Sequence, residues 1–142
     1  MKTKLPASVR LSDEIPGYPV FEIAHPKCTA RVALHGAHVM SWCPADEEEV
    51  LYLSPDAVVT EGKAIRGGIP LCWPWFNAHP TNPEQPSHGI ARTRFWGLLG
   101  AEEDESGVTI RFGMEEGIWK AELTVKAGAE LEVSLETLNT NE

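Results

Sequence analysis

The positive charges of this chain are concentrated in one short stretch. The 142 residues carry a net charge of −9, yet residues 62–97 hold four basic residues against one acid: Lys63, Arg66, Arg92 and Arg94 against Glu84. Guanidinium groups bind phosphate through forked, charge-assisted hydrogen bonds. This patch therefore favours a small anionic ligand held by Arg66 and Arg92. Chance clustering is the alternative, because a charge cluster alone is weak evidence.

The same stretch contains groups that suit a sugar. Trp75 and Phe76 offer flat apolar faces for the C–H face of a pyranose ring. His88 precedes a glycine and is a hydrogen-bond donor at neutral pH that can bind a sugar oxygen. Gly67 and Gly68 allow the main chain to take positive φ or to approach a ligand closely. Together these residues predict a site for a sugar that carries an anionic group.

The elements that must position this site are strands. Apolar and polar residues alternate with a period of two in several short segments, as in an antiparallel sheet with one solvated face. Residues 127–129 have the composition of a hairpin turn. The pattern predicts a mainly β protein, an antiparallel β-sandwich. The expected strands cover residues 18–23, 28–34, 36–42, 50–53, 108–112, around 123–125, and 130–138.

The candidate site lies in a segment without a regular period. Residues 54–94 are rich in proline, glycine, asparagine and histidine. An irregular segment of this length is uncommon in a compact domain and is usually functional where it occurs. Trp73 and Trp96, at its two ends, are more typical of a core than of a sugar platform. Arg94 is more typical of a structural or solvated residue than of a ligand contact, and a structural ion pair is the alternative for Arg92.

Composition excludes several classes of partner. The net charge of −9 argues against nucleic acid and against an anionic membrane. No apolar run reaches the ~20 residues of a membrane helix, and the first residues do not resemble a signal peptide. Three widely spaced cysteines do not suggest a disulfide framework. We therefore expect a cytoplasmic protein. His35 and His38 would face opposite sides of a strand, so no metal site is expected.

Four motifs together resemble one known family. They are G-A-H-V-M-S-W at residues 36–42, G-K-A-I-R-G-G-I-P at 62–70, W-P-W-F at 73–76 and H-G-I-A-R at 88–92. In this order they are similar to the hexose-6-phosphate mutarotase branch of the aldose 1-epimerase (galactose-mutarotase-like) family. The resemblance extends from about residue 21 to the end. It implies that residues 1–142 form one domain that is part of a larger antiparallel β-supersandwich.

The resemblance also implies a reaction and roles for residues. The family interconverts the α and β anomers of an aldose, here a hexose 6-phosphate, without a cofactor. His88 matches the family's first active-site histidine, which binds and polarises the sugar near its ring oxygen. Arg66 and Gly67 match the ligand-binding R-G-G motif, and Arg92 matches a phosphate contact. Trp75 and Phe76 match the aromatic wall by position.

The resemblance places two further groups outside this sequence. The family's second histidine, its general acid, and its glutamate base would both follow residue 142. General acid–base catalysis needs a donor and an acceptor placed together. Three readings therefore stay open: an enzyme, a non-catalytic sugar-phosphate binding module, and one half of a split enzyme. The uncovered edge of a half sandwich favours a homo-oligomer or a complementing C-terminal half as partner.

Overall fold

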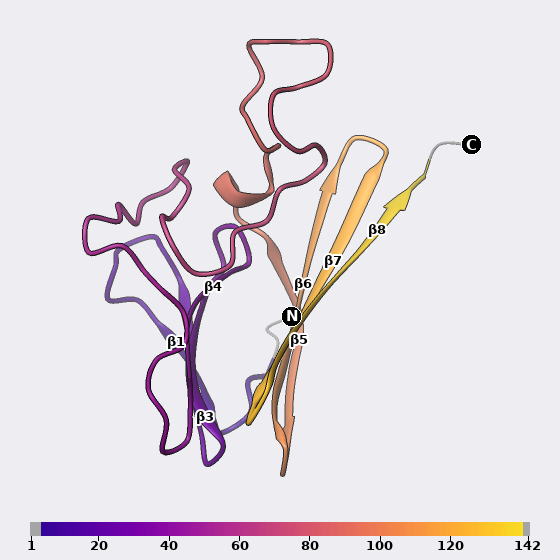
Figure 1. The fold of residues 1–142 in the computed structure, drawn as a ribbon. Coiled ribbons are helices and arrows are strands. Elements are labelled where there is room, and N and C mark those ends of the chain that lie inside the picture. Colours follow the sequence, from indigo (N-terminus) through magenta and orange to yellow (C-terminus); the bar gives the residue numbers. More distant parts are fainter. Residues whose placement is uncertain (1–3, 141–142) are drawn as a thin grey trace.

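The computed structural model describes residues 4–140, which form two antiparallel four-stranded sheets (Figure 1). Each sheet is a meander in which every strand pairs with its neighbour in sequence. The first sheet contains β1 (Val9–Ser12), β2 (Val20–His25), β3 (Cys28–Ala33) and β4 (His38–Pro44). The second contains β5 (Gly97–Asp104), β6 (Gly107–Glu116), β7 (Trp119–Gly128) and β8 (Leu131–Asn139). The predicted antiparallel β-sandwich is confirmed.

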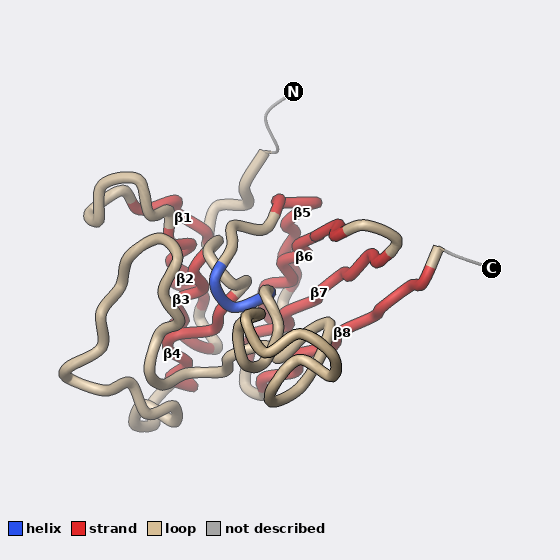
Figure 2. Tube along the Cα trace, turned by 90° about the horizontal axis from the view of Figure 1, so that it is seen from above, coloured by secondary structure: helices blue, strands red, loops and turns tan. Residues whose placement is uncertain are grey.

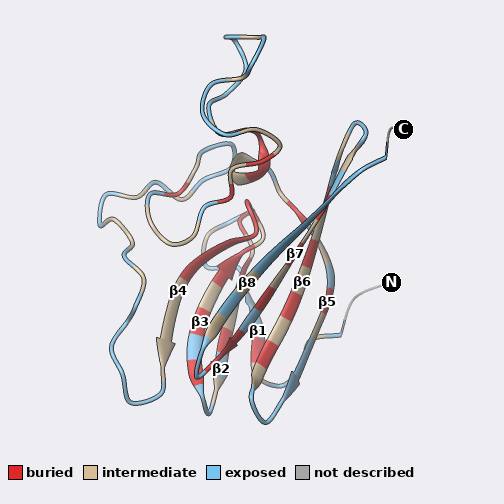
Figure 3. Cartoon of the chain, turned by 45° about the vertical axis from the view of Figure 1, so that its right-hand side comes forward, coloured by how far each residue is buried: buried red, intermediate tan, exposed pale blue. Residues whose placement is uncertain are grey.

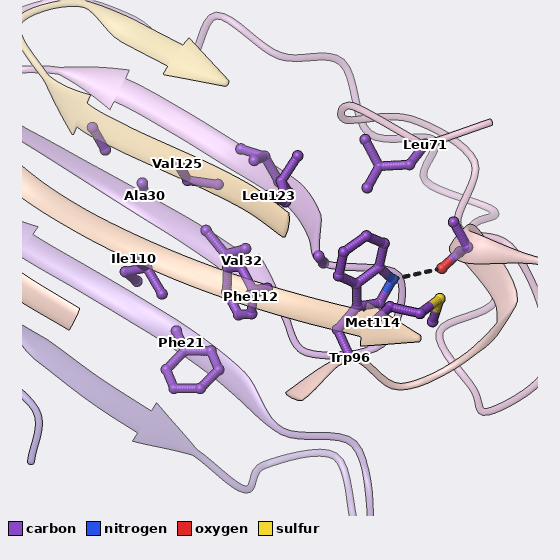
Figure 4. Packing of buried hydrophobic residues seen from close by; sticks show 14 of the residues in the cluster. Phe21, Ala30, Val32, Leu71, Trp96, Ile110, Phe112, Met114, Leu123 and Val125 are labelled. Atoms are coloured by element: carbon purple, nitrogen blue, oxygen red, sulfur yellow. Dashed lines mark hydrogen bonds between the residues drawn. The ribbon is translucent and has the colours of Figure 1, made fainter. Parts of the chain in front are cut away.

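The core lies between the two sheets and follows from the alternation in sequence. In β6, Val108, Ile110 and Phe112 are at most 1% exposed, while the residues between them are half-buried. Because side chains alternate across a strand, one face of β6 packs inward. The rings of Phe21 in β2 and Phe112 meet edge to face, with centroids 5.7 Å apart (Figure 4). This contact joins the inner faces of the two sheets.

Strand β8 lies at one edge of its sheet, as β5 does at the other. It pairs with β7 on one side, and no other strand of residues 4–140 pairs with its second edge. Leu135 stands opposite the fully buried Leu123 in the ladder but is 39% exposed. Figure 3 shows β8 in the colour of exposed residues along most of its length. The predicted open edge is therefore present. Leu131 and Val133 pack on the core, whereas the apolar side of β8 is left uncovered at Leu135.

Two predicted strands are wrong in part. Gly36 and Ala37 form a turn with positive φ instead of the start of a strand, so β4 begins at His38. Residues 50–53 form no strand, because loop residues form hydrogen bonds with their main chain. The Glu49 carboxylate accepts the N–H of Leu51 at 2.9 Å, and only an isolated bridge remains at residue 53. Strands β1 and β5 were not predicted, since neither shows a clean alternation.

The predicted irregular segment is confirmed. Between β4 and β5 the chain has one short 3-10 helix, η1 (Ala91–Thr93). Much of the segment crosses one end of the two sheets (Figures 1 and 2). Trp73 and Trp96 are buried as expected, and Trp96 Nε1 donates to the carbonyl of Ala91 at 2.9 Å (Figure 4). The core thus anchors both ends of the candidate-site region.

Candidate functional site

The segment around Arg66 is held between β4 and a neighbouring loop. On one side, Ser54 N–H donates to the Arg66 carbonyl at 2.9 Å, and Gly68 N–H donates to the Tyr52 carbonyl at 2.7 Å. On the other side, Ile69 N–H donates to the carbonyl of Val39 in β4 at 2.9 Å. The R-G-G segment therefore continues the hydrogen bonding of the first sheet towards the loop end.

Both glycines of this segment are required by close packing. Gly67 and Gly68 have φ of +120° and +64°. A Cβ atom on Gly67 would lie 2.4 Å from the carbonyl oxygen of Tyr52, and one on Gly68 would lie 2.2 Å from that of Val39. Both distances are impossible without backbone movement. Positive φ, one of the two sequence-based explanations for these glycines, is therefore confirmed.

Arg66 and Arg92 line the same hollow. Its volume is about 660 Å³, and its other lining residues include Tyr52, Ser54 and Gly67. Within residues 4–140, neither arginine forms an ion pair with a carboxylate. Arg92 Nη2 donates to the carbonyl of Ser87 at 3.3 Å. The Arg92 Nε atom is buried and has no hydrogen-bond partner. The hollow thus combines two guanidinium groups without a compensating acid among the lining residues.

His88 lies beside Phe76 and is fixed by Asn77. The rings of Phe76 and His88 are tilted to each other, with centroids 4.8 Å apart. Asn77 N–H donates to His88 Nδ1 at 3.0 Å, and His88 N–H donates to the Asn77 carbonyl at 2.8 Å. Since Nδ1 accepts, the neutral imidazole carries its proton on Nε2. His88 has φ of +67°, which is uncommon for a residue with a side chain. His88 is thus held in a defined tautomer, with Nε2 as a free donor.

The aromatic residues and the arginines form separate groups. Trp75 packs edge to face on His79, with centroids 4.5 Å apart, and donates through Nε1 to the Pro86 carbonyl at 2.8 Å. Trp75, Phe76 and His88 are not among the residues that line the arginine hollow. The link between the groups is short, because Arg92 bonds to Ser87, the residue before His88.

Two fully buried histidines lie beneath the site. His38 Nε2 is 2.6 Å from the Gly67 carbonyl oxygen. His35 Nε2 accepts the N–H of Gly62 at 3.0 Å, and its Nδ1 is 3.3 Å from the Tyr18 hydroxyl. Burial lowers the pKa of both histidines. Burial also raises the pKa of Tyr18 to about 12. The sequence reasoning considered these histidines only as metal ligands and missed their contacts with the site loop.

The remaining sequence expectations concern Arg94, the other residues of the hollow, metal ligands and membrane spans. Arg94 forms an exposed ion pair with Glu116, which agrees with the structural or solvated role expected for it. Tyr52 and Ser54 line the hollow but were not chosen from the sequence; their place in the Tyr-Leu-Ser-Pro run before the R-G-G motif was the available signal.

In the described part of the chain, no three His, Cys, Asp or Glu residues could hold a metal ion together. Residues 4–140 contain no helix long and apolar enough to span a membrane.

Comparison with known proteins decides the family. The aldose 1-epimerase family profile matches residues 19–141. The chain belongs to the aldose 1-epimerase family. Relatives from Salmonella typhimurium and Escherichia coli are each 40% identical, over 123 and 124 residues, and both bear the name "Putative glucose-6-phosphate 1-epimerase". The alignments cover 80% and 81% of this chain but only 42% of each relative.

Solved structures agree with this assignment. A mutarotase-like crystal structure, YeaD from Salmonella typhimurium, superposes with a TM-score of 0.88 at 33% identity, covering 96% of this chain and 49% of that one. The structure of HI1317 gives a TM-score of 0.80 at 29% identity, covering 94% and 49%. The chain therefore has a mutarotase-like fold and spans about half the length of these family members.

Proposed function

We propose that this chain binds a hexose 6-phosphate and takes part in interconverting its α and β anomers. The observation that carries the proposal is the hollow shared by Arg66 and Arg92, which lack carboxylate partners in residues 4–140. A phosphate monoester carries up to two negative charges and accepts forked hydrogen bonds from guanidinium groups. Gly67, which also lines the hollow, approaches the ligand through its main chain.

In this proposal His88, Trp75 and Phe76 contact the sugar ring. Anomer exchange requires a base to remove the proton of the C1 hydroxyl while an acid protonates the ring oxygen. The bond from C1 to the ring oxygen breaks, C1–C2 rotates, and the aldehyde is attacked again from its other face. Asn77 occupies Nδ1 of His88, so the Nε2–H group is the donor that polarises the sugar near its ring oxygen.

The base comes from outside the described residues. None of the residues that line the arginine hollow is an acid. The full-length relatives carry more than twice the matched sequence. We therefore propose that residues 1–142 bind the substrate but turn it over only with a complementing C-terminal half. Non-catalytic binding of a sugar phosphate is the second candidate, favoured by the absence of an acid from the hollow lining. No cofactor is needed for either role.

The complement is proposed to cover β8. No second strand of residues 4–140 pairs with the outer edge of β8, and Leu135 and Leu138 are 39% and 58% exposed. A second copy of the chain is the alternative occupant.

Cytoplasmic localisation belongs to the same proposal, supported by three free cysteines, Cys28, Cys43 and Cys72.

Exchange spectroscopy tests this function directly. The rate at which the two anomers of glucose 6-phosphate interconvert is measured by NMR with buffer, with the 142-residue chain, and with the chain plus a C-terminal half taken from a full-length relative. We expect the chain alone to match buffer and the combination to exceed it. The His88→Ala variant should abolish the gain. Exchange at the buffer rate in all samples, with no binding of the sugar phosphate, would reject the proposal.

A further inference from the structure

The loop that carries Arg66 depends on one side chain from below. Four hydrogen bonds hold the main chain of residues 66–69, and three of them join main-chain groups. These three persist after most substitutions, because they need no particular side chain. The fourth runs from His38 Nε2 to the Gly67 carbonyl oxygen at 2.6 Å. His38 is the first residue of β4 and is fully buried.

The hydrogen bond determines the state of the His38 ring. A carbonyl oxygen only accepts, so Nε2 carries the proton. Nδ1 is buried and has no hydrogen-bond partner. A second proton on Nδ1 would create an unpaired buried donor and a charge in the field of Arg92 and His35. Burial, with smaller contributions from these two groups, lowers the pKa of His38. The ring is therefore neutral near pH 7, with its single N–H directed at Gly67.

The His38 side chain packs tightly against the loop. A Cβ atom on Gly68 would lie 2.8 Å from His38 Nε2. The imidazole therefore contacts both glycines of the R-G-G motif, one through its hydrogen bond and one through packing. Arg66 immediately precedes these glycines and lines the hollow with Arg92. A displacement of the Gly67 carbonyl thus moves the main chain from which the Arg66 guanidinium extends.

We propose that His38 is a positioning residue, which sets the place of the Arg66 guanidinium by holding the Gly67 carbonyl through Nε2–H. The assignment of Arg66 to a phosphate rests on the proposed function. The hydrogen bond itself does not, and the two can be tested separately. His38 contacts no substrate in this role, because it is fully buried beneath the loop.

A matched pair of variants separates the hydrogen bond from the packing. His38→Gln retains an N–H donor at the ε position, whereas His38→Met has a similar length and no donor. Val125→Ala, at a buried core position in β7, is the control for lost stability alone. For each chain the dissociation constants of glucose 6-phosphate and of glucose are measured by NMR titration, together with hydrogen exchange at the amides of residues 68 and 69.

We expect His38→Met to weaken glucose 6-phosphate binding about tenfold, because a buried carbonyl loses its donor, while glucose binding changes little. His38→Gln should restore most of this affinity, and Val125→Ala should leave it unchanged. The two amides should exchange faster in His38→Met than in His38→Gln. Equal behaviour of the Gln and Met variants would overturn the proposal.

Two outcomes distinguish this inference from the proposed function. If the wild-type chain does not bind glucose 6-phosphate, the proposed function fails, and amide exchange still decides the role of His38. If His38→Met does not fold, the tautomer of His38 in the wild-type chain is read from the NMR signals of its ring nitrogens. A proton on Nε2 between pH 6 and pH 8 supports the inference, and a proton on Nδ1 overturns it.

Discussion

The core between the sheets and the loop end of the molecule are stabilised in different ways. Most of the core consists of alternating apolar side chains from β2, β3, β6 and β7, which are largely interchangeable with residues of similar volume. The loop end depends on specific groups: glycines with positive φ, a histidine donor and main-chain bridges. The first region sets the stability of the fold, and the second sets the geometry of the arginine hollow.

The largest effect is expected in the core. Phe112→Ala removes a ring that is 0% exposed and packs on Phe21, so unfolding should require about 3–5 kcal/mol less free energy. Urea unfolding measures this change. Any variant protein that remains folded should keep the ligand affinity of the wild-type chain. A loss below about 1 kcal/mol would show that the inter-sheet contact contributes little to stability.

Gly68→Ala should impair ligand binding as well as stability, unlike Phe112→Ala. The added Cβ would lie 2.2 Å from the Val39 carbonyl oxygen at a φ of +64°, so the loop must move. We expect about 1–3 kcal/mol of destabilisation from strain of this kind, together with a loss of sugar-phosphate binding at protein concentrations where the chain is folded. Gly62→Ala is the matched control, since its φ is +82° and its Cβ would meet no atom within 4 Å. Equal binding by both variants would contradict the separation of the two regions.

The acid sensitivity of the fold should also come from the loop end. Burial lowers the pKa of His35 and His38 below the ordinary value of 6.5. The unfolded chain then binds more protons, so stability falls as pH decreases from about 6.5 towards the folded-state pKa values, with a slope of up to about 1.4 kcal/mol per pH unit for each histidine. Urea unfolding at pH 7, 6 and 5 measures the slope.

Controls can assign this slope. His38→Gln should reduce it, and Val125→Ala in the core should leave it unchanged. The carboxylates of Glu49 and Glu103 have a pKa lowered from 4.5, so their contribution is lost only at lower pH. A stability that stays constant from pH 7 to pH 5 would mean that the two histidines do not remain neutral in the folded protein.

The smallest effect is expected at Arg94. Its ion pair with Glu116 is exposed, with 49% and 41% of the two side chains accessible. Exposed pairs contribute about 0–1 kcal/mol. Arg94→Ala should therefore change neither stability nor sugar-phosphate affinity appreciably, although it removes one of the basic residues of the patch. A tenfold loss of affinity would place Arg94 in the site as well and extend the hollow towards β6.

The same contrast explains what the sequence could predict. The alternation of Val108, Ile110 and Phe112 was sufficient to predict β6, because burial on one face leaves a period of two. The motifs identified Arg66 and Arg92 as a pair, and both line one hollow. His38 was missed because its role depends on a bond to residue 67, and such a distant contact leaves no trace in local spacing. The turn at residues 36 and 37 was mistaken for a strand because it too depends on contacts that leave no trace in local spacing.

The central claim is that the paired guanidinium groups bind the phosphate of a hexose phosphate. The most direct test compares the affinities of the 142-residue chain for glucose 6-phosphate and for glucose by NMR titration, in the wild type, Arg66→Gln and Arg92→Gln. A charged hydrogen bond contributes about 1.5–3 kcal/mol, so the phosphate should improve binding at least tenfold in the wild type. Each substitution should remove most of that gain. Equal affinities for the two sugars in the wild-type chain would contradict the claim.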